Sequence, residues 1–134
     1  MDDTHSLEGS CHCGALGWKY LGMPESATAC NCTSCRRWGG LWAYGTEGER
    51  IAVRGESRVY TRGPNLAYHF CPTCAAVGWW RLQKPDADGR FAVAVNLRLA
   101  EPGPIAHLPI EHFEGLEAFE DLPRDGRCVR DLWF

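Results

Sequence analysis

The chain has 134 residues, with 17 acidic residues, 14 basic residues and a formal net charge of -3. This length is typical of one domain, which we predict over residues 1–134, and an acidic balance without runs of like charge argues against nucleic-acid binding. No apolar run approaches the roughly 20 residues of a membrane span, and the N-terminus lacks the pattern of a signal peptide, so we expect a cytoplasmic protein without a membrane partner.

Seven short segments rich in β-branched and aromatic residues follow one another along the chain, separated by Gly, Pro, Asn or Asp. They cover residues 16–21, 41–46, 51–54, 59–62, 67–70, 77–82 and 91–97. Fifteen glycines and eight prolines indicate many turns and few long helices. Helical turns are expected only at residues 33–38 and 116–122. The pattern predicts an all-β fold of short antiparallel sheets with minimal helix.

Seven of the eight cysteines lie in clusters. They are Cys11 and Cys13, then Cys30, Cys32 and Cys35, then Cys71 and Cys74, whereas Cys128 stands alone. An even number of cysteines is compatible with disulfides in a secreted protein. Without a secretory signal, the reducing cytosol favours metal binding or redox chemistry over disulfides.

The first and last pairs predict one metal site, which we call the four-cysteine cluster (Cys11, Cys13, Cys71 and Cys74). Tetrahedral zinc at ~2.3 Å from each sulfur needs neighbouring sulfurs roughly 3.7 Å apart. Cys11 and Cys13 meet this requirement if they lie on one face of an extended strand, and Cys71 and Cys74 meet it on a turn. Four thiolates leave no vacant position, so the site is expected to be structural. Buried apolar cysteines or a redox pair are the alternative.

The middle group, the three-cysteine cluster, places Cys30, Cys32 and Cys35 within six residues. A zinc site with three protein ligands keeps its fourth position for water or substrate. Three thiolates give the site a net charge of about -1, so the metal ionises water poorly and prefers another thiol as its fourth ligand. The alternative is that Cys128 or a histidine closes this site and makes it structural.

Four residues near the three-cysteine cluster are candidates for substrate contacts. Arg36 and Arg37 follow it directly, and guanidinium groups bind carboxylates bidentately. Trp38 and Trp42 flank the same loop and are candidates to wall a pocket, although tryptophans more often pack in a core. No general acid can be named from the sequence.

Three segments also carry a resemblance to a known family. They are Gly9-Ser10-Cys11-His12-Cys13-Gly14-Ala15, Cys30-Asn31-Cys32-Thr33-Ser34-Cys35-Arg36-Arg37 and Phe70-Cys71-Pro72-Thr73-Cys74. They resemble the signatures of the glutathione-dependent formaldehyde-activating enzyme family, which also contains centromere protein V, and a looser similarity extends the motif core over residues 9–113. The resemblance implies a β-tent-like fold, a structural zinc at the four-cysteine cluster and a second zinc at the three-cysteine cluster that handles glutathione adducts. It also implies carbon-sulfur lyase chemistry that joins formaldehyde to glutathione.

The chain departs from the family pattern at two places. Ala75 stands where the motif usually continues with glycine, and a positive φ there would cost alanine about 1 to 2 kcal/mol. The tail over residues 127–134 has no family counterpart.

Together, the cysteine spacing and the family resemblance predict a zinc-dependent carbon-sulfur lyase similar to S-(hydroxymethyl)glutathione synthase, with two zinc ions per chain, one structural and one catalytic. The three-cysteine cluster is expected to carry the chemistry, and Arg36 and Arg37 are expected to bind substrate. The expected partners are glutathione or a similar small thiol and an aldehyde, with a homodimer as a possible assembly. The alternative is a non-catalytic zinc-binding interaction module, which a filled fourth metal position would favour.

Overall fold

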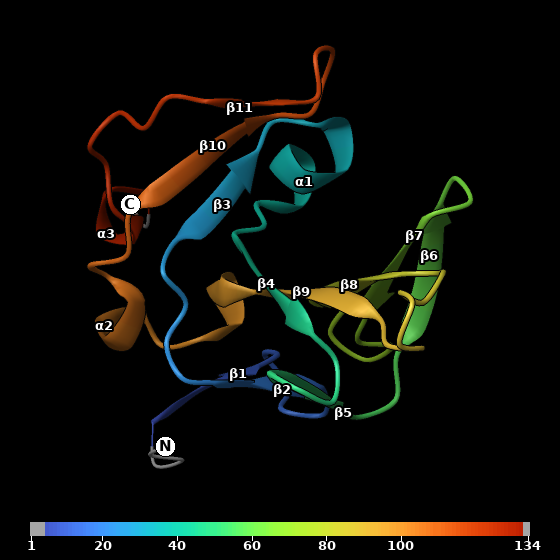
Figure 1. Ribbon diagram of the computed structural model, residues 1–134. Coiled ribbons are helices and arrows are strands. Elements are labelled where there is room, and N and C mark those ends of the chain that lie inside the picture. Colours follow the sequence, from blue (N-terminus) through green and yellow to red (C-terminus); the bar gives the residue numbers. More distant parts are fainter. Residues whose placement is uncertain (1–4, 133–134) are drawn as a thin grey trace.

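The computed structural model describes residues 5–132 (Figure 1). Its strands are β1 (Ser6–Ser10), β2 (Gly17–Leu21), β3 (Ala27–Cys30), β4 (Trp42–Thr46), β5 (Ile51–Arg54), β6 (Arg58–Arg62), β7 (Leu66–Phe70), β8 (Val77–Leu82), β9 (Ala92–Asn96), β10 (Ile110–Glu114) and β11 (Glu120–Leu122). Its helices are α1 (Thr33–Trp38), the 3-10 turn η1 (Leu97–Leu99), α2 (Pro102–Ile105) and α3 (Val129–Leu132). This confirms an all-β class with little helix.

The strands form two sheets. The smaller has the order β1-β2-β5, and the larger has the order β11-β10-β3-β4-β9-β8-β7-β6. Figure 1 shows β3, β10 and β11 on one side of the molecule and β6 and β7 on the other. Sequential antiparallel pairing dominates, but β10 runs parallel to β3 and so brings the C-terminal part of the chain beside the segment that enters α1.

The seven predicted strands are confirmed as β2 and β4 to β9, and the predicted helix at residues 33–38 is confirmed as α1. The helix expected at residues 116–122 is wrong, because this segment forms a turn followed by β11. The carboxylate of Glu114 accepts the amides of Glu117 and Ala118, which ties the backbone into a tight turn. The sheets are antiparallel as predicted, apart from the parallel pairing of β3 with β10.

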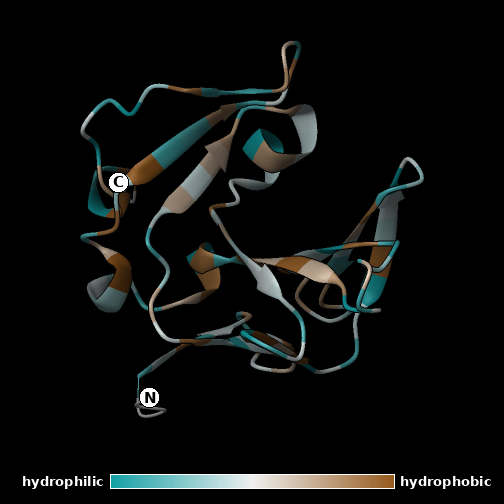
Figure 2. Cartoon of the chain, viewed as in Figure 1, coloured by the Kyte–Doolittle hydropathy of each residue, from teal (hydrophilic) through white to brown (hydrophobic). Residues whose placement is uncertain are grey.

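The main apolar core lies between the two sheets. Leu16, Val95, Leu97, Ile105 and Ile110 are among its buried side chains. Figure 2 shows hydrophobic residues along several of the strands, whereas two of the three residues of β11 are acidic. None of the helices in residues 5–132 has the length and apolar character needed to span a membrane.

A buried polar residue, Asn96, joins three strands of the larger sheet near its centre. Its side-chain oxygen accepts the amide of Leu41, and its Nδ2 donates to the carbonyl of Val77 at 2.8 Å. Because both ends of the amide have partners, this burial costs little free energy. The contacts fix β4 and β8 around β9, and the three-cysteine cluster lies beside a small second core on this framework.

Candidate metal centres and their cavity

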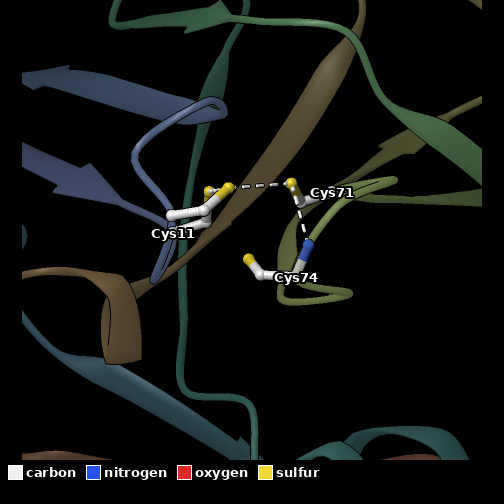
Figure 3. Close-up of side chains that lie close together, drawn as sticks. Cys11, Cys71 and Cys74 are labelled. Atoms are coloured by element: carbon white, nitrogen blue, oxygen red, sulfur yellow. Dashed lines mark hydrogen bonds between the residues drawn. The ribbon is translucent and has the colours of Figure 1, made fainter.

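The four-cysteine cluster is assembled from two turns that belong to different sheets. Cys11 and Cys13 lie on the turn after β1, and Cys71 and Cys74 lie on the turn between β7 and β8. The Sγ of Cys13 lies 3.7 Å from that of Cys11 and 3.5 Å from that of Cys71. Figure 3 shows the sulfurs of Cys11, Cys71 and Cys74 pointing toward one another. The cluster therefore lies where the smaller sheet meets the larger one.

The sequence predicted that Cys11 and Cys13 lie on an extended strand, but the structure places them on a turn. The backbone turns after Cys11, where the amide of Gly14 donates to the Cys11 carbonyl at 3.0 Å and Gly14 adopts a φ of 84°. The amide of Leu16 then donates to the Cys11 sulfur at 3.3 Å. A turn places both sulfurs on its inner side and provides amides that stabilise a thiolate, which a strand committed to sheet pairing does not.

The second pair forms a compact turn around the Cys71 sulfur. The amides of Thr73 and Cys74 donate to this sulfur at 3.4 Å and 3.5 Å. The amides of Cys13 and Ala76 hold the pKa of the Cys74 thiol at about 6, so thiolate is readily formed here. Ala75 adopts a φ of 66°, which confirms that an L-residue bears the strain predicted for this position.

A metal ion fits these four residues by both geometry and chemistry. All four sulfurs lie within 4.8 Å of one another, and the nearest pairs match the roughly 3.7 Å separation of a tetrahedral zinc-thiolate site. A donor set made only of soft thiolates suits zinc better than magnesium or calcium.

The three-cysteine cluster comes from one short stretch of chain. Cys30 ends β3, Cys32 is the N-cap of α1, and Cys35 lies in α1, with all three sulfurs within 4.8 Å of one another. The amide of Cys35 donates to the Cys32 sulfur at 3.4 Å, so one thiol caps the helix and faces its partners. Gly39 ends the helix in the left-handed conformation at a φ of 70°.

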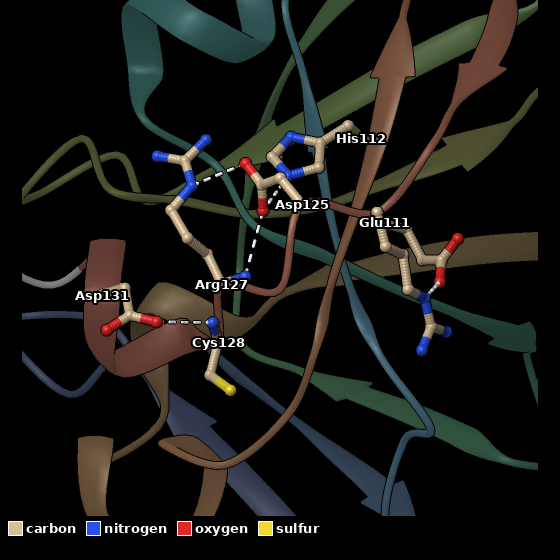
Figure 4. Close-up of polar contacts among 7 residues, drawn as sticks. Glu111, His112, Asp125, Arg127, Cys128 and Asp131 are labelled. Atoms are coloured by element: carbon tan, nitrogen blue, oxygen red, sulfur yellow. Dashed lines mark hydrogen bonds and ion pairs between the residues drawn. The ribbon is translucent and has the colours of Figure 1, made fainter.

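Within residues 5–132, no histidine, cysteine or carboxylate adds a fourth ligand to this cluster. Cys128, the candidate for closing it, lies beside α3, where its amide donates to Asp131 at 2.8 Å (Figure 4). His112 lies near this region too and pairs with the carboxylate of Asp125 at 3.2 Å. The three-cysteine cluster is therefore open among the described residues.

The thiols of the open cluster differ in acidity. Burial raises the pKa of the Cys32 thiol, but the Ser34 hydroxyl and the Cys35 amide outweigh it and lower this pKa to about 6. Burial raises the pKa of Cys35 to about 12. Arg62 donates from Nη1 to the Cys32 sulfur at 3.2 Å and to the Ser34 oxygen at 3.3 Å. A guanidinium thus lies directly against the most acidic thiol of the cluster.

A cavity of about 130 Å³ opens over the three sulfurs. Its other lining residues are Trp42, Tyr44, Arg62, Leu66, Tyr68, Trp80, Phe113, Gly115 and Phe119. Trp42 therefore walls the pocket as anticipated, whereas Trp38 is 42% exposed and contacts the edge of the Tyr68 ring at a centroid distance of 4.7 Å. Apolar and aromatic walls with one cation suit a small organic substrate.

The structure brings Arg62, rather than the two predicted arginines, to the cavity. Arg36 and Arg37 are exposed on α1 and do not line it. Arg62 ends β6, and pairing with β7 opposes it to Leu66, another residue of the cavity wall. No local sequence signal singled it out, because its approach to Cys32 depends on contacts between segments distant in sequence.

A larger cavity of about 820 Å³ is lined by residues of the smaller sheet and of the segment from η1 to the start of α2. Glu8, Lys19, Arg54 and Glu101 give it mixed charge, and its only thiol is Cys11 of the four-cysteine cluster. The chemistry that the cysteines can support therefore belongs to the smaller cavity, where three sulfurs and Arg62 converge.

Comparison with known proteins agrees with this arrangement. A Halomonas elongata protein named "Putative glutathione-dependent formaldehyde-activating enzyme" is 27% identical over 135 residues, which cover 91% of this chain and 85% of the relative. The crystal structure of a Rhodobacter sphaeroides protein is similar with a TM-score of 0.53 and 28% identity, over 71% of this chain and 88% of that chain. A family model described as "Glutathione-dependent formaldehyde-activating enzyme" matches residues 6–107, a span that includes both cysteine clusters. The chain belongs to the glutathione-dependent formaldehyde-activating enzyme family.

Proposed function

We propose that the protein is a zinc-dependent carbon-sulfur lyase that joins a thiol of the glutathione type to formaldehyde or a related aldehyde and separates them again. One observation carries the proposal: the three-cysteine cluster lacks a fourth described ligand and lines an apolar cavity together with Arg62. Family membership and the name of the Halomonas elongata relative support glutathione and formaldehyde as the substrates.

The two cysteine clusters take different roles in this proposal. The four-cysteine cluster would hold a structural zinc, because its four thiolates complete a tetrahedron. Cys30, Cys32 and Cys35 would hold the second zinc. When bound, this ion would act as a Lewis acid with an affinity for sulfur and would lower the pKa of a substrate thiol. Reduced thiols at both sites also support a cytoplasmic location.

The residues of the cavity position the reactants. Arg62 provides a cation for a carboxylate of the thiol substrate, and its contact with Ser34 fixes the direction of the guanidinium. The Ser34 hydroxyl lies 3.1 Å from the Tyr68 hydroxyl, which places two hydrogen-bonding groups beside the sulfurs. The aromatic walls exclude water from the reacting atoms.

The reaction needs no oxidant or reductant. The substrate sulfur forms a bond to the aldehyde carbon, the π electrons of the carbonyl move to its oxygen, and the proton that leaves the thiol ends on that oxygen. The reverse steps release the aldehyde. Holding sulfur and carbonyl together in one cavity lowers the entropic cost of addition.

Equilibrium exchange is the best test, because formaldehyde adds to glutathione rapidly without a catalyst. Exchange NMR on a mixture of the two compounds should show an interconversion rate that rises with the concentration of zinc-loaded wild-type protein. Cys32→Ala should remove this increase. Cys128→Ala, which changes a thiol outside both clusters, should retain it.

Zinc content must be measured on the same samples. An unchanged rate in wild-type protein that contains two zinc ions per chain would contradict the lyase function. Glutathione binding without any rate change would favour a carrier or an interaction module instead.

A further inference from the structure

We infer that the cavity over the three-cysteine cluster accepts adducts whose aldehyde-derived carbon carries an apolar group of phenyl or branched-alkyl size. The hairpin between β10 and β11 sets this preference through Phe113 and Phe119. The inference rests on the proposed function, because it assigns a substrate class to the same site. Both phenylalanines lie beyond residue 107, where the family match ends.

The hairpin is attached to the cysteine segment itself. Parallel pairing of β3 with β10 puts Phe113 beside Cys30. Asn31, the next residue, accepts the amides of Gly115 and Leu116 at 2.9 Å and 3.1 Å through its side-chain oxygen. These contacts join the end of β10 to the loop that carries the sulfurs.

Glu114 completes this attachment from the other side. One carboxylate oxygen accepts a hydrogen bond from the side-chain Nδ2 of Asn31 at 3.0 Å. The other accepts the amides of Glu117 and Ala118 at 2.9 Å and 2.7 Å. The turn that precedes Phe119 is therefore fixed by side chains, although it lies at the surface.

The hairpin backbone approaches the cluster as closely as glycine permits. A Cβ atom on Gly115 would lie 2.6 Å from the Cys30 sulfur, well inside van der Waals contact. Phe119 adopts a φ of 52°, a left-handed conformation that is unusual for a bulky residue. It is 66% exposed, yet its ring lines the cavity and meets Phe113 edge-on at a centroid distance of 6.3 Å. Strain of this kind persists where the surroundings hold a residue in place.

The size and chemistry of the cavity indicate what these rings contact. Its volume of about 130 Å³ approaches the roughly 150 Å³ of an engineered apolar cavity that binds benzene. Cavities that enclose a drug-sized ligand are about 300 to 1,000 Å³, so most of the peptide part of glutathione must extend beyond this cavity. Besides its sulfur and hydroxyl oxygen, the carbon of a formaldehyde adduct bears only hydrogens and would leave part of the aromatic walls uncovered. A phenyl or branched-alkyl group on that carbon would cover them.

Stable thioether analogues test this preference by binding, independently of turnover. S-benzylglutathione carries the apolar group, and S-methylglutathione mimics the bare carbon. Titration calorimetry on zinc-loaded wild-type protein should give on the order of tenfold tighter binding of the benzyl compound. Phe119→Asn should remove most of this difference, because Asn tolerates the left-handed conformation while the ring is lost.

Leu116→Ala is the matched control. Leu116 lies on the same turn and is 50% exposed, but it does not line the cavity, so this variant should keep the benzyl preference. Equal wild-type affinities for the two thioethers, or the same loss in both variants, would overturn the inference.

The formaldehyde exchange assay separates this inference from the proposed function. Faster formaldehyde exchange without a benzyl preference would leave the lyase function standing and remove the apolar substrate class. A benzyl preference that depends on Phe119, in protein that accelerates no exchange, would support the apolar pocket and contradict the lyase function.

Discussion

The two cysteine clusters are assembled from the same side chain in different ways. The four-cysteine cluster draws its ligands from turns on separate sheets, with Cys13 and Cys71 lying 58 positions apart in the chain. The three-cysteine cluster is local, from Cys30 to Cys35, and depends on long-range contacts only for its walls. One cluster joins distant segments, and the other presents sulfurs to a cavity.

This difference predicts how much a metal bound at each cluster contributes to the free energy of folding. A metal that joins distant segments contributes its binding free energy to folding, because the site does not exist in the unfolded chain. Three cysteines within six residues, from the end of β3 to the first turn of α1, close only a short loop, so a metal bound there would contribute less to the fold. Two substitutions test this prediction, and two further experiments test the turn of the four-cysteine cluster and the hairpin over the three-cysteine cluster.

The largest effect is expected from Cys13→Ala. Cys13 is exposed, so the substitution removes a metal ligand without opening the core. Structural zinc contributes about 10 kcal/mol or more in zinc-finger peptides, and the thermal midpoint should fall steeply along with soluble yield. Thermal denaturation and elemental analysis measure both consequences. His12→Ala, an exposed neighbour, is the control, and a wild-type midpoint with two zinc ions in Cys13→Ala would contradict a structural role.

Cys32→Ala should have a smaller effect on stability and a complete effect on exchange activity. It removes one thiolate and the N-cap of α1, and losing a cap costs about 1 kcal/mol. We expect one zinc ion per chain and a modest fall in the free energy of unfolding by denaturant. Cys32→Ser keeps a capping oxygen and should recover most of that free energy. If Cys32→Ala unfolds as readily as Cys13→Ala, the distinction between the clusters is wrong.

Ala75→Gly should stabilise the turn of the four-cysteine cluster by about 1 kcal/mol. Glycine adopts the observed φ of 66° without the steric cost that alanine bears. Urea denaturation of zinc-loaded protein measures the gain. Ala76→Gly is the matched control, since Ala76 lacks a positive φ and should lose stability. A loss of stability in Ala75→Gly would show that the turn imposes no strain.

The smallest effect concerns acid and the hairpin over the three-cysteine cluster. The amides of Ala118 and Glu117, with the side chain of Asn31, lower the pKa of Glu114 below its usual 4.5. Because the pKa of Glu114 is lowered in the folded protein, the stability contributed by its hydrogen bonds is fully present above pH 4.5. This stability is lost as the pH falls through the pKa of Glu114 in the folded protein. Amide hydrogen exchange at residues 117 and 118 should show this loss.

Glu114→Gln is the control for that measurement, because the amide keeps one acceptor but cannot titrate. In Glu114→Gln, amide hydrogen exchange at residues 117 and 118 should show no change below pH 4.5 that comes from protonation of residue 114. Metal loss in acid affects both proteins, so only the difference between them reports the carboxylate. Identical profiles would contradict the role of Glu114 in holding the hairpin.

The local features of this protein were determined by the sequence alone. Close spacing brings Cys30, Cys32 and Cys35 together where β3 leads into α1, and alternating or β-branched runs predict strands such as β2 and β9. Ala75 could be identified as a strained position through the family resemblance, because the motif usually has glycine there. Such features depend on interactions within a few residues, which composition and spacing encode directly.

Tertiary structure decided which residues surround the open cluster. Arg62 reaches Cys32 from the far end of β6, and Arg36 and Arg37, although adjacent in sequence, face solvent from α1. The parallel pairing of β3 with β10 carries Phe113 to Cys30 across most of the chain. Strand partners and register come from the total burial and hydrogen bonding of the fold, so no local pattern could have placed these side chains at the cavity.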